Sequence, residues 1–204
     1  MSTEILTYKT LAESRESEFR DRGSRFLGYA FSVETLAEIK THLHHLKEMH
    51  PKAVHHCYAY RLGWQGTQFR ANDDGEPSGS AGKPILGQID SLGLVNTLVV
   101  VVRYFGGTLL GVPGLINAYK TTSQLCLQQA LCVEKDIELP YQLEFDYQQM
   151  NGVMRLLKQV DARIQQQDLQ LFCLIQAGIP KRNLARFLQE TSNIEHQVIT
   201  RKVD

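Results

Sequence analysis

The chain has 204 residues, of which 43% are hydrophobic and 22% are charged, with 22 basic and 22 acidic side chains. This length allows one large domain or two small ones, and the ordinary globular composition excludes disordered, collagen-like and low-complexity proteins. A net charge of zero provides no bulk attraction for nucleic acid, so any anionic partner must be bound by a local cluster. The longest aliphatic run, Leu98–Val102, is too short for a membrane helix, and the first residues lack a signal-peptide pattern. With four scattered cysteines, the sequence predicts a cytoplasmic protein with reduced thiols and no membrane partner.

The first elements that the sequence predicts are two strands and a helix. Residues 18–20 and 24–31 are expected to be strands on either side of a turn at residues 21–23. A helix is expected after Ser32, which could cap it, and before Pro51, which a helix cannot continue through. Its apolar residues recur at steps of three and four: Leu36, Ile39, Leu43, Leu46 and Met49.

A hairpin and a loop follow. Residues 54–61 and 67–72 are expected to pair as strands across the turn at residues 63–66. Residues 73–84, with the sequence DDGEPSGSAGKP, contain three glycines and two prolines, so they predict an irregular loop. This loop is expected to open a helix over residues 83–92.

The middle of the chain then supplies a buried strand and a long helix. Residues 97–104 form an apolar run that is typical of a strand covered on both faces. A glycine-rich loop over residues 105–114 connects this strand to a helix expected over residues 115–132.

The pattern changes near Ile137, which predicts a boundary between two domains, residues 1–137 and 138–204. The second segment carries a strand–helix–strand–strand–helix–strand order, which is the ferredoxin-like pattern. The expected elements are strand 141–147, helix 152–160, a hairpin of 162–166 and 169–176 that turns at Gln167–Asp168, helix 184–189 and strand 194–203.

Two loops could carry chemistry. Gly79, Gly82 and Lys83, at the start of a helix, could hold an anion through free amides and an ammonium group, although the spacing is not that of a P-loop or an EF-hand. A rigid loop capped by aspartate explains the same residues without a ligand. The carboxylates of Asp73, Asp74 and Glu76 would then cap amides, pair with basic side chains or hold a divalent cation, and we favour capping.

The second loop follows Arg103 and Tyr104, and its glycines lack the spacing of a dinucleotide site. They could equally be required for close packing of strand and helix. Six of the seven histidines lie between His42 and His56, but no complete set of metal ligands accompanies them. The sequence therefore predicts neither a metal nor a cofactor.

Five segments together resemble the IMPACT family, and the bacterial YigZ-type members in particular: residues 23–26, 55–59, 73–84, 102–111 and 114–119. This resemblance implies an α+β protein whose N-terminal domain is like those of elongation factor G and a small-subunit ribosomal protein, with a left-handed βαβ crossover. It also implies a ferredoxin-like C-terminal domain and a link to translation control. The family motif falls on Arg25, His55, His56, Asp73, Asp74, Gly75, Glu76, Pro77, Gly79, Gly82, Lys83, Pro84, Arg103, Tyr104, Gly106, Gly107 and Gly111.

Our leading hypothesis is a non-enzymatic, translation-linked regulatory protein that binds RNA or a ribosome-associated component. Arg25, Lys83 and Arg103 would contact phosphates, while His56 and Tyr104 would stack on bases. The glycines at 79, 82, 106 and 107 would let an anion approach the backbone. One alternative is an enzyme that acts on a phosphorylated or anionic small molecule, with an acidic loop residue as base or metal ligand. Another is an interaction module for a protein partner in translation control.

Overall fold

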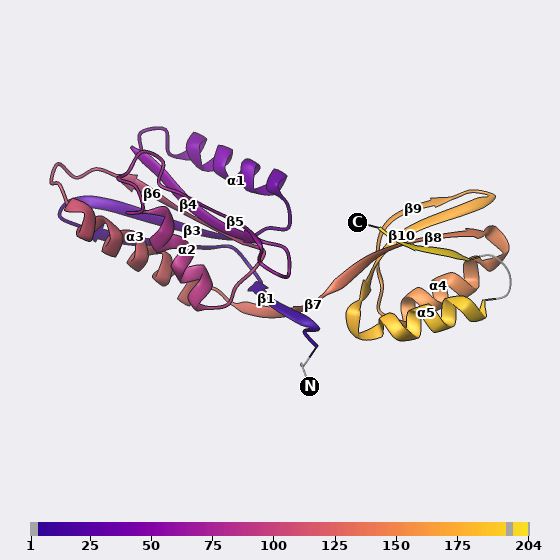
Figure 1. The fold of residues 1–204 in the computed structure, drawn as a ribbon. Helices are drawn as coiled ribbons and strands as arrows, with labels where there is room; N and C mark the ends of the chain where they lie inside the picture. The colour runs from indigo at the N-terminus through magenta and orange to yellow at the C-terminus, as the bar shows by residue number, and fades with distance from the viewer. Residues whose placement is uncertain (1–3, 195–197, 204) are drawn as a thin grey trace. The chain divides into compact units, whose positions relative to one another are not determined.

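The computed structural model describes residues 4–194 and 198–203, which form two compact units (Figure 1). One unit comprises Tyr8–Lys135, and the other begins at Asp136 and also includes the N-terminal residues up to Thr7. No helix among the described residues is both long enough and apolar enough to cross a membrane.

The N-terminal unit is built on a five-stranded antiparallel sheet with the order β2-β3-β6-β4-β5. Its strands are β2 Arg15–Asp21, β3 Ser24–Ser32, β4 His55–Leu62, β5 Gln68–Asn72 and β6 Thr97–Tyr104. The central strand β6 is buried from Thr97 to Arg103 because helices cover both faces of the sheet.

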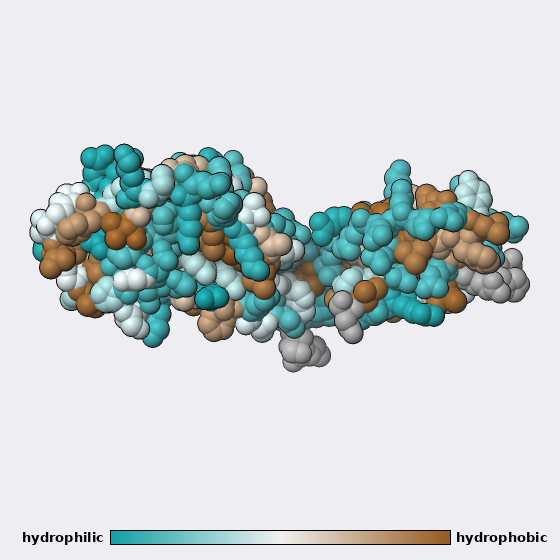
Figure 2. Space-filling view, turned by 90° about the horizontal axis from the view of Figure 1, so that it is seen from above, coloured by the Kyte–Doolittle hydropathy of each residue, from teal (hydrophilic) through white to brown (hydrophobic). Residues whose placement is uncertain are grey.

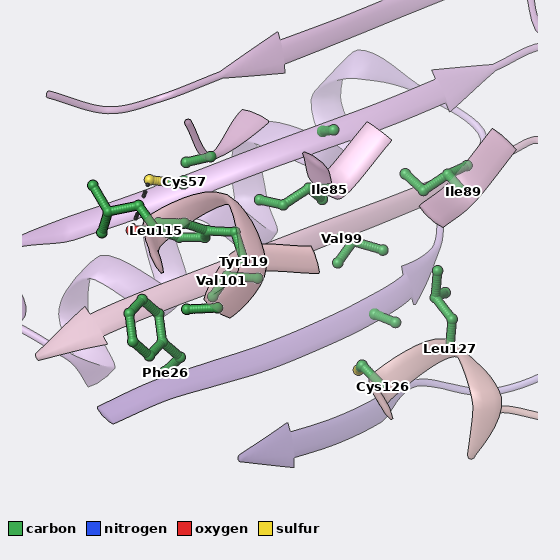
Figure 3. Close-up of a cluster of buried hydrophobic side chains, with 14 of the residues drawn as sticks. Phe26, Cys57, Ile85, Ile89, Val99, Val101, Leu115, Tyr119, Cys126 and Leu127 are labelled. Carbon is green, nitrogen blue, oxygen red and sulfur yellow. Dashed lines mark hydrogen bonds between the residues drawn. The ribbon is translucent and has the colours of Figure 1, made fainter. Parts of the chain in front are cut away.

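Three helices cover the two faces of the sheet (Figure 1). Helix α1, Leu36–Met49, lies against one face, where it packs over Leu98, Val100 and Val102. Helices α2, Gly82–Ser91, and α3, Gly111–Gln128, lie against the other face, over Val99 and Val101. Figure 3 shows this second core, where side chains of α2 and α3 meet those of the strands.

Three details differ from the sequence prediction. Thr35, rather than Ser32, caps α1: its Oγ1 accepts a hydrogen bond from the Glu38 amide, and the Glu38 carboxylate accepts one from the Glu34 amide. Helix α3 begins four residues earlier than expected because Pro113 fits its first turn. Helix α3 ends at Gln128, four residues before the expected end, and Cys132 instead begins strand β7, Cys132–Asp136, which pairs with β1, Thr7–Leu11.

The second unit confirms the ferredoxin-like order, with an antiparallel sheet arranged β11-β8-β10-β9. Its elements are β8 Glu138–Asp146, η1 Tyr147–Gln149, α4 Met150–Gln159, β9 Arg163–Leu169, β10 Phe172–Pro180, η2 Lys181–Asn183, α5 Leu184–Asn193 and β11 Ile199–Lys202. The β9–β10 hairpin turns at Gln170 and Leu171, three residues later than predicted. The last strand was expected from Ile194, but residues 195–197 of that prediction lie outside the described residues.

Helices α4 and α5 cover one face of this sheet. The buried side chains of β8 and β10, including Leu143, Phe145 and Ile175, pack there with Val153 of α4 and Phe187 of α5. The alternate residues of the same strands, such as Gln142 and Gln176, point to the opposite face.

Candidate functional site

The loop that follows β5 is organised by the carboxylate of Asp73. Its Oδ1 accepts hydrogen bonds from the amides of Ala81 at 3.0 Å and Gly82 at 2.8 Å, and its Oδ2 accepts one from Gly79 at 2.9 Å. Burial raises the pKa of Asp73. The hydrogen bonds from these three amides together lower the pKa by more than burial raises it, so the pKa lies below its usual value. The amides that the sequence assigned to an external anion are therefore already occupied by a carboxylate of the chain itself.

Asp74 ties the same loop to β4. Its Oδ2 accepts a hydrogen bond from the His56 amide at 2.6 Å, and its carbonyl oxygen accepts one from His55 Nδ1 at 2.7 Å. The residue has a positive φ of 42°, as does Gly75 at 89°, so the chain reverses sharply at this point. Because Nδ1 of His55 binds the Asp74 carbonyl oxygen, Nε2 is the ring nitrogen that lies near Glu76, 3.9 Å from its Oε1.

Glu76 carries a buried carboxylate, with only 3% of its side chain exposed. Its Oε1 lies 2.6 Å from Arg103 Nη1 and accepts a hydrogen bond from the Tyr119 hydroxyl at 2.7 Å. A buried carboxylate is tolerated when a cation and further hydrogen bonds compensate its lost hydration, and both are present here.

Tyr119 links this ion pair to Cys57, whose thiol donates a hydrogen bond to the tyrosine hydroxyl at 3.3 Å (Figure 3). Burial raises the pKa of Tyr119 and of Cys57. Both groups are therefore protonated at neutral pH, and Cys57 is not an activated nucleophile.

A cavity of about 430 Å³ opens beside the ion pair. Its charged or titratable lining residues are His55, Glu76 and Arg103. The others are apolar or glycine: Val54, Pro77, Phe105, Leu109, Leu110, Gly111, Val112 and Leu115. We call this cavity the apolar pocket. Leu109, at its edge, is 81% exposed, and with the exposed Phe105 and Val112 it forms an apolar surface of the kind that marks interaction sites.

The sequence suggested that Arg103 contacts phosphate, but the structure places this side chain in the interior. Only 7% of its side chain is exposed, and its guanidinium lies 5.5 Å from the ring centre of Phe26 and 5.6 Å from that of Phe105. Its positive charge is balanced by Glu76, and among the described residues its Nε has no hydrogen-bond partner. Arg103 is therefore a buried part of the pocket wall.

The predicted stacking residues lie on the other face of the sheet. His56 pairs directly with Val102 across the strands, and both point toward α1, as does Tyr104. The Tyr104 hydroxyl lies 2.9 Å from His50 Nδ1. Burial lowers the pKa of His56, and this buried histidine has no hydrogen-bond partner for its Nε2 among the described residues. His56 is thus a neutral core residue and is not available for stacking on a base.

Arg25 also lies on the α1 side, opposite Tyr104 in the β3–β6 register. It forms an ion pair with Glu18, with Nη2 2.7 Å from Oε2, and this hydrogen bond raises the pKa of Arg25. Lys83 is exposed in the first turn of α2, on the opposite side of the sheet. The predicted basic residues therefore do not converge on one surface.

The glycines of the second loop serve close packing. A Cβ added to Gly106 would lie 1.9 Å from the carbonyl carbon of Gly23, so the loop after β6 and the β2–β3 turn can approach only without a side chain. Gly107 has a φ of 87°, which favours glycine. In the described part of the chain, no group of three or more His, Cys, Asp or Glu side chains is arranged to hold a metal ion.

Sequence reasoning missed two components of this region. Tyr119 ends the motif segment 114–119, but it was given no role at the site because a buried tyrosine in the middle of a helix resembles an ordinary core residue. The pocket edge formed by Phe105, Leu109 and Val112 was also missed. The sequence did contain a sign of it, because large apolar residues in and beside a loop can indicate an exposed apolar surface.

The fold and the site define a class of protein: an α+β protein of two units in which the loop of residues 73–84 is hydrogen-bonded to the N-terminal sheet. The family model "Impact N-terminal domain" matches residues 22–127. IMPACT family member YigZ of Escherichia coli (strain K12) is 36% identical over 166 residues, which cover 80% of this chain and 81% of that protein. YvyE, the IMPACT family member of Bacillus subtilis (strain 168), is 35% identical over 153 residues, covering 75% and 70%. The chain therefore belongs to the IMPACT family.

A solved structure supports the fold of the whole chain. It is described as the crystal structure of a hypothetical protein, is 30% identical, and has a TM-score of 0.80 over 98% of this chain and 99% of the other. This similarity extends through both units.

Proposed function

We propose that this chain is a non-enzymatic regulator of translation whose N-terminal unit binds a protein component of the translation machinery at the apolar pocket. Family membership supports the link to translation, because the resemblance implies such a role. The observation that carries the choice of partner is the pocket itself. The Arg103 guanidinium in its wall is already neutralised by Glu76, while apolar side chains such as Leu109 stand exposed at its edge.

A protein segment fits this surface better than an RNA backbone does. Phosphates are bound by accessible basic groups, but Arg103 is buried and paired. An apolar side chain of a partner would instead be removed from water by Phe105, Leu109 and Val112.

An enzyme that uses the acidic loop is less well supported. The carboxylates of Asp73 and Asp74 already accept hydrogen bonds from backbone amides, and that of Glu76 is held by Arg103 and Tyr119. None of the three is placed as a free base toward the pocket.

Direct RNA binding is a second candidate, and the observation in its favour lies on the α1 side. Arg25 and Tyr104 face each other across β3 and β6, and 46% of the Arg25 side chain is exposed. A cation beside an aromatic ring is a common element of single-strand binding sites.

Purified bacterial ribosomes and a reconstituted translation reaction provide the test. Wild-type protein is compared with Leu109→Ser, which alters the pocket edge, and with Leu131→Ser, which removes an equally large exposed leucine that does not line the pocket. We expect Leu109→Ser to weaken both co-sedimentation and the effect on translation about tenfold, since it removes one buried aliphatic contact. Leu131→Ser should behave like the wild type.

Two results would contradict the proposal. If the wild type neither co-sediments nor alters translation, the proposed function fails. If instead Arg25→Gln abolishes binding while Leu109→Ser does not, and affinity falls steeply with salt, RNA binding on the α1 side replaces the protein partner.

A further inference from the structure

The C-terminal sheet has one face that no described element of its own unit covers. Helices α4 and α5 pack on the side of Leu143, Phe145 and Ile175, as described above. The register places Glu144 opposite Leu174 in β10 and opposite Ile199 in β11, so these three side chains share the other face. Leu174 in turn faces Asp168 of the edge strand β9.

Large apolar side chains stand at one end of this face. Phe172 is 75% exposed, and Ile199 is 47% exposed. They line a groove of about 640 Å³ together with Leu174. Figure 2 looks onto the sheet side of this unit and shows hydrophobic groups set among hydrophilic ones. Exposed aromatic and aliphatic groups around a groove are typical of an interaction surface.

Three carboxylates surround that apolar centre. Glu144, Asp146 and Asp168 all line the groove. Within the described residues, none of the three forms an ion pair, and Glu144 accepts a hydrogen bond only from the neutral Gln142 amide. The register brings two basic residues to this face, Arg201 opposite Gln142 and Arg163 opposite Gly178. Arg163 forms an ion pair with Glu138, and neither arginine lines the groove. The groove thus has a net negative charge in a chain whose total charge is zero.

We propose that this surface, the acidic sheet face of Glu144, Asp146, Asp168, Phe172, Leu174 and Ile199, binds a basic amphipathic segment of a protein partner. Apolar side chains of the partner cover Phe172, Leu174 and Ile199. Lysine or arginine side chains around them pair with the three carboxylates. This inference is independent of the apolar pocket, which belongs to the other unit.

Charge distinguishes this partner from RNA. A four-stranded sheet can bind single-stranded RNA when aromatic side chains stack on bases and basic side chains contact the phosphates. Here Phe172 could stack, but the groups around it are carboxylates, which repel phosphate. The same repulsion becomes attraction for a basic segment.

The test uses the full chain and three labelled probes: an 18-residue amphipathic leucine–lysine peptide, its leucine–glutamate counterpart, and a single-stranded 20-nucleotide RNA. The double variant Asp146→Asn/Asp168→Asn removes two charges from the acidic sheet face. Its control, Glu48→Gln/Glu190→Gln, removes two exposed charges from helices α1 and α5 and so changes net charge equally. Phe172→Ser removes the apolar centre.

We expect the lysine peptide to bind the wild type more tightly than either other probe. The Asp146/Asp168 double variant should lose about fivefold in affinity, the effect of two exposed ion pairs, and Phe172→Ser about tenfold. The control double variant should bind like the wild type. Backbone amide NMR shifts should change in residues 142–146, 166–174 and 199–201.

Three outcomes overturn the proposal. Equal losses in both double variants would mean that only net charge matters. Tighter binding of the RNA than of the lysine peptide, in competition with it, would assign the face to nucleic acid. Shift changes confined to other residues would place peptide binding elsewhere. Melting temperatures of the variants show whether any loss of binding reflects loss of folding.

Discussion

Arg103 and Glu76 lie 27 residues apart in the chain, yet they form a buried ion pair with 2.6 Å between Nη1 and Oε1. The pair joins the end of β6 to the loop after β5 and is completed by Tyr119 from α3. Three elements are thereby fixed to one another at the wall of the apolar pocket.

Removal of one partner from this pair should be strongly destabilising. We expect Glu76→Ala to lower the free energy of unfolding by about 3–5 kcal/mol, because Arg103 would keep a buried charge without its counterion. Urea unfolding followed by the fluorescence of Trp64, the only tryptophan, measures this in the N-terminal unit. The control Asp90→Asn breaks the more exposed Arg61–Asp90 pair and should cost less than about 1 kcal/mol. Equal costs in the two variants would contradict a special role for the buried pair.

Asp73 should make the stability of the N-terminal unit depend on pH. Its pKa is lower in the folded chain than its ordinary value, so its contribution is complete above the ordinary pKa and is lost as pH falls toward the folded pKa. Asp73→Asn should therefore reduce stability by about 1 kcal/mol at pH 7 and flatten the decline in stability below pH 5. Urea midpoints at pH 7 and pH 4 test this expectation, and an unchanged pH profile would contradict it.

Asp74 provides a matched comparison within the same loop. Asp74→Asn retains a side-chain oxygen for the His56 amide and should be tolerated, whereas Asp74→Ala should cost about 1 kcal/mol. Magnesium should not stabilise the wild type if the carboxylates serve the backbone. A magnesium-dependent rise in melting temperature that Asp74→Asn abolishes would favour the metal alternative.

Two glycine substitutions should have opposite effects. Gly106→Ala would place a Cβ against the backbone of Gly23, which cannot move aside without disrupting the β2–β3 turn, so we expect a loss of at least about 2 kcal/mol. Gly87 lies within α2 and has no atom within 4 Å of an added Cβ. Gly87→Ala should therefore stabilise the helix by about 0.5–1 kcal/mol. Thermal melts of both variants check the difference in sign.

The ferredoxin-like unit should fold without the N-terminal unit, and Ile137 should contribute to its stability. Ile137 is fully buried, and its backbone carbonyl oxygen accepts a hydrogen bond from the Lys181 amide. We expect residues 138–204 to melt cooperatively, and residues 136–204 to melt at a temperature higher by about 5 °C or more. If the longer fragment shows no cooperative transition, this unit is not an independent domain.

Local patterns in the sequence were sufficient to predict most elements and the family. The steps of three and four in residues 36–49 predicted α1, and the apolar run in residues 97–104 predicted β6, because each pattern reports burial along a single element. The order of elements after Ile137 predicted the ferredoxin-like unit, which the structure confirms. The motif segments predicted IMPACT family membership, which the comparisons confirm. Strands β1 and β7 were missed because each is short and depends on a partner more than 100 residues away.

Only the tertiary structure determined what the motif residues do. Adjacent residues of a strand point to opposite faces, so the β3–β4–β6 register sends Arg103 and His55 toward α3 but Tyr104, His56 and Arg25 toward α1. The sequence could identify Asp73 as a cap. It could not show that the Asp73 carboxylate accepts hydrogen bonds from the same loop amides that were predicted to bind an external anion. Pairing of Glu76 with Arg103 likewise depends on contacts between distant segments. Residue type and spacing limit the chemistry of a group, but its accessible charge is set by the neighbours that folding brings to it.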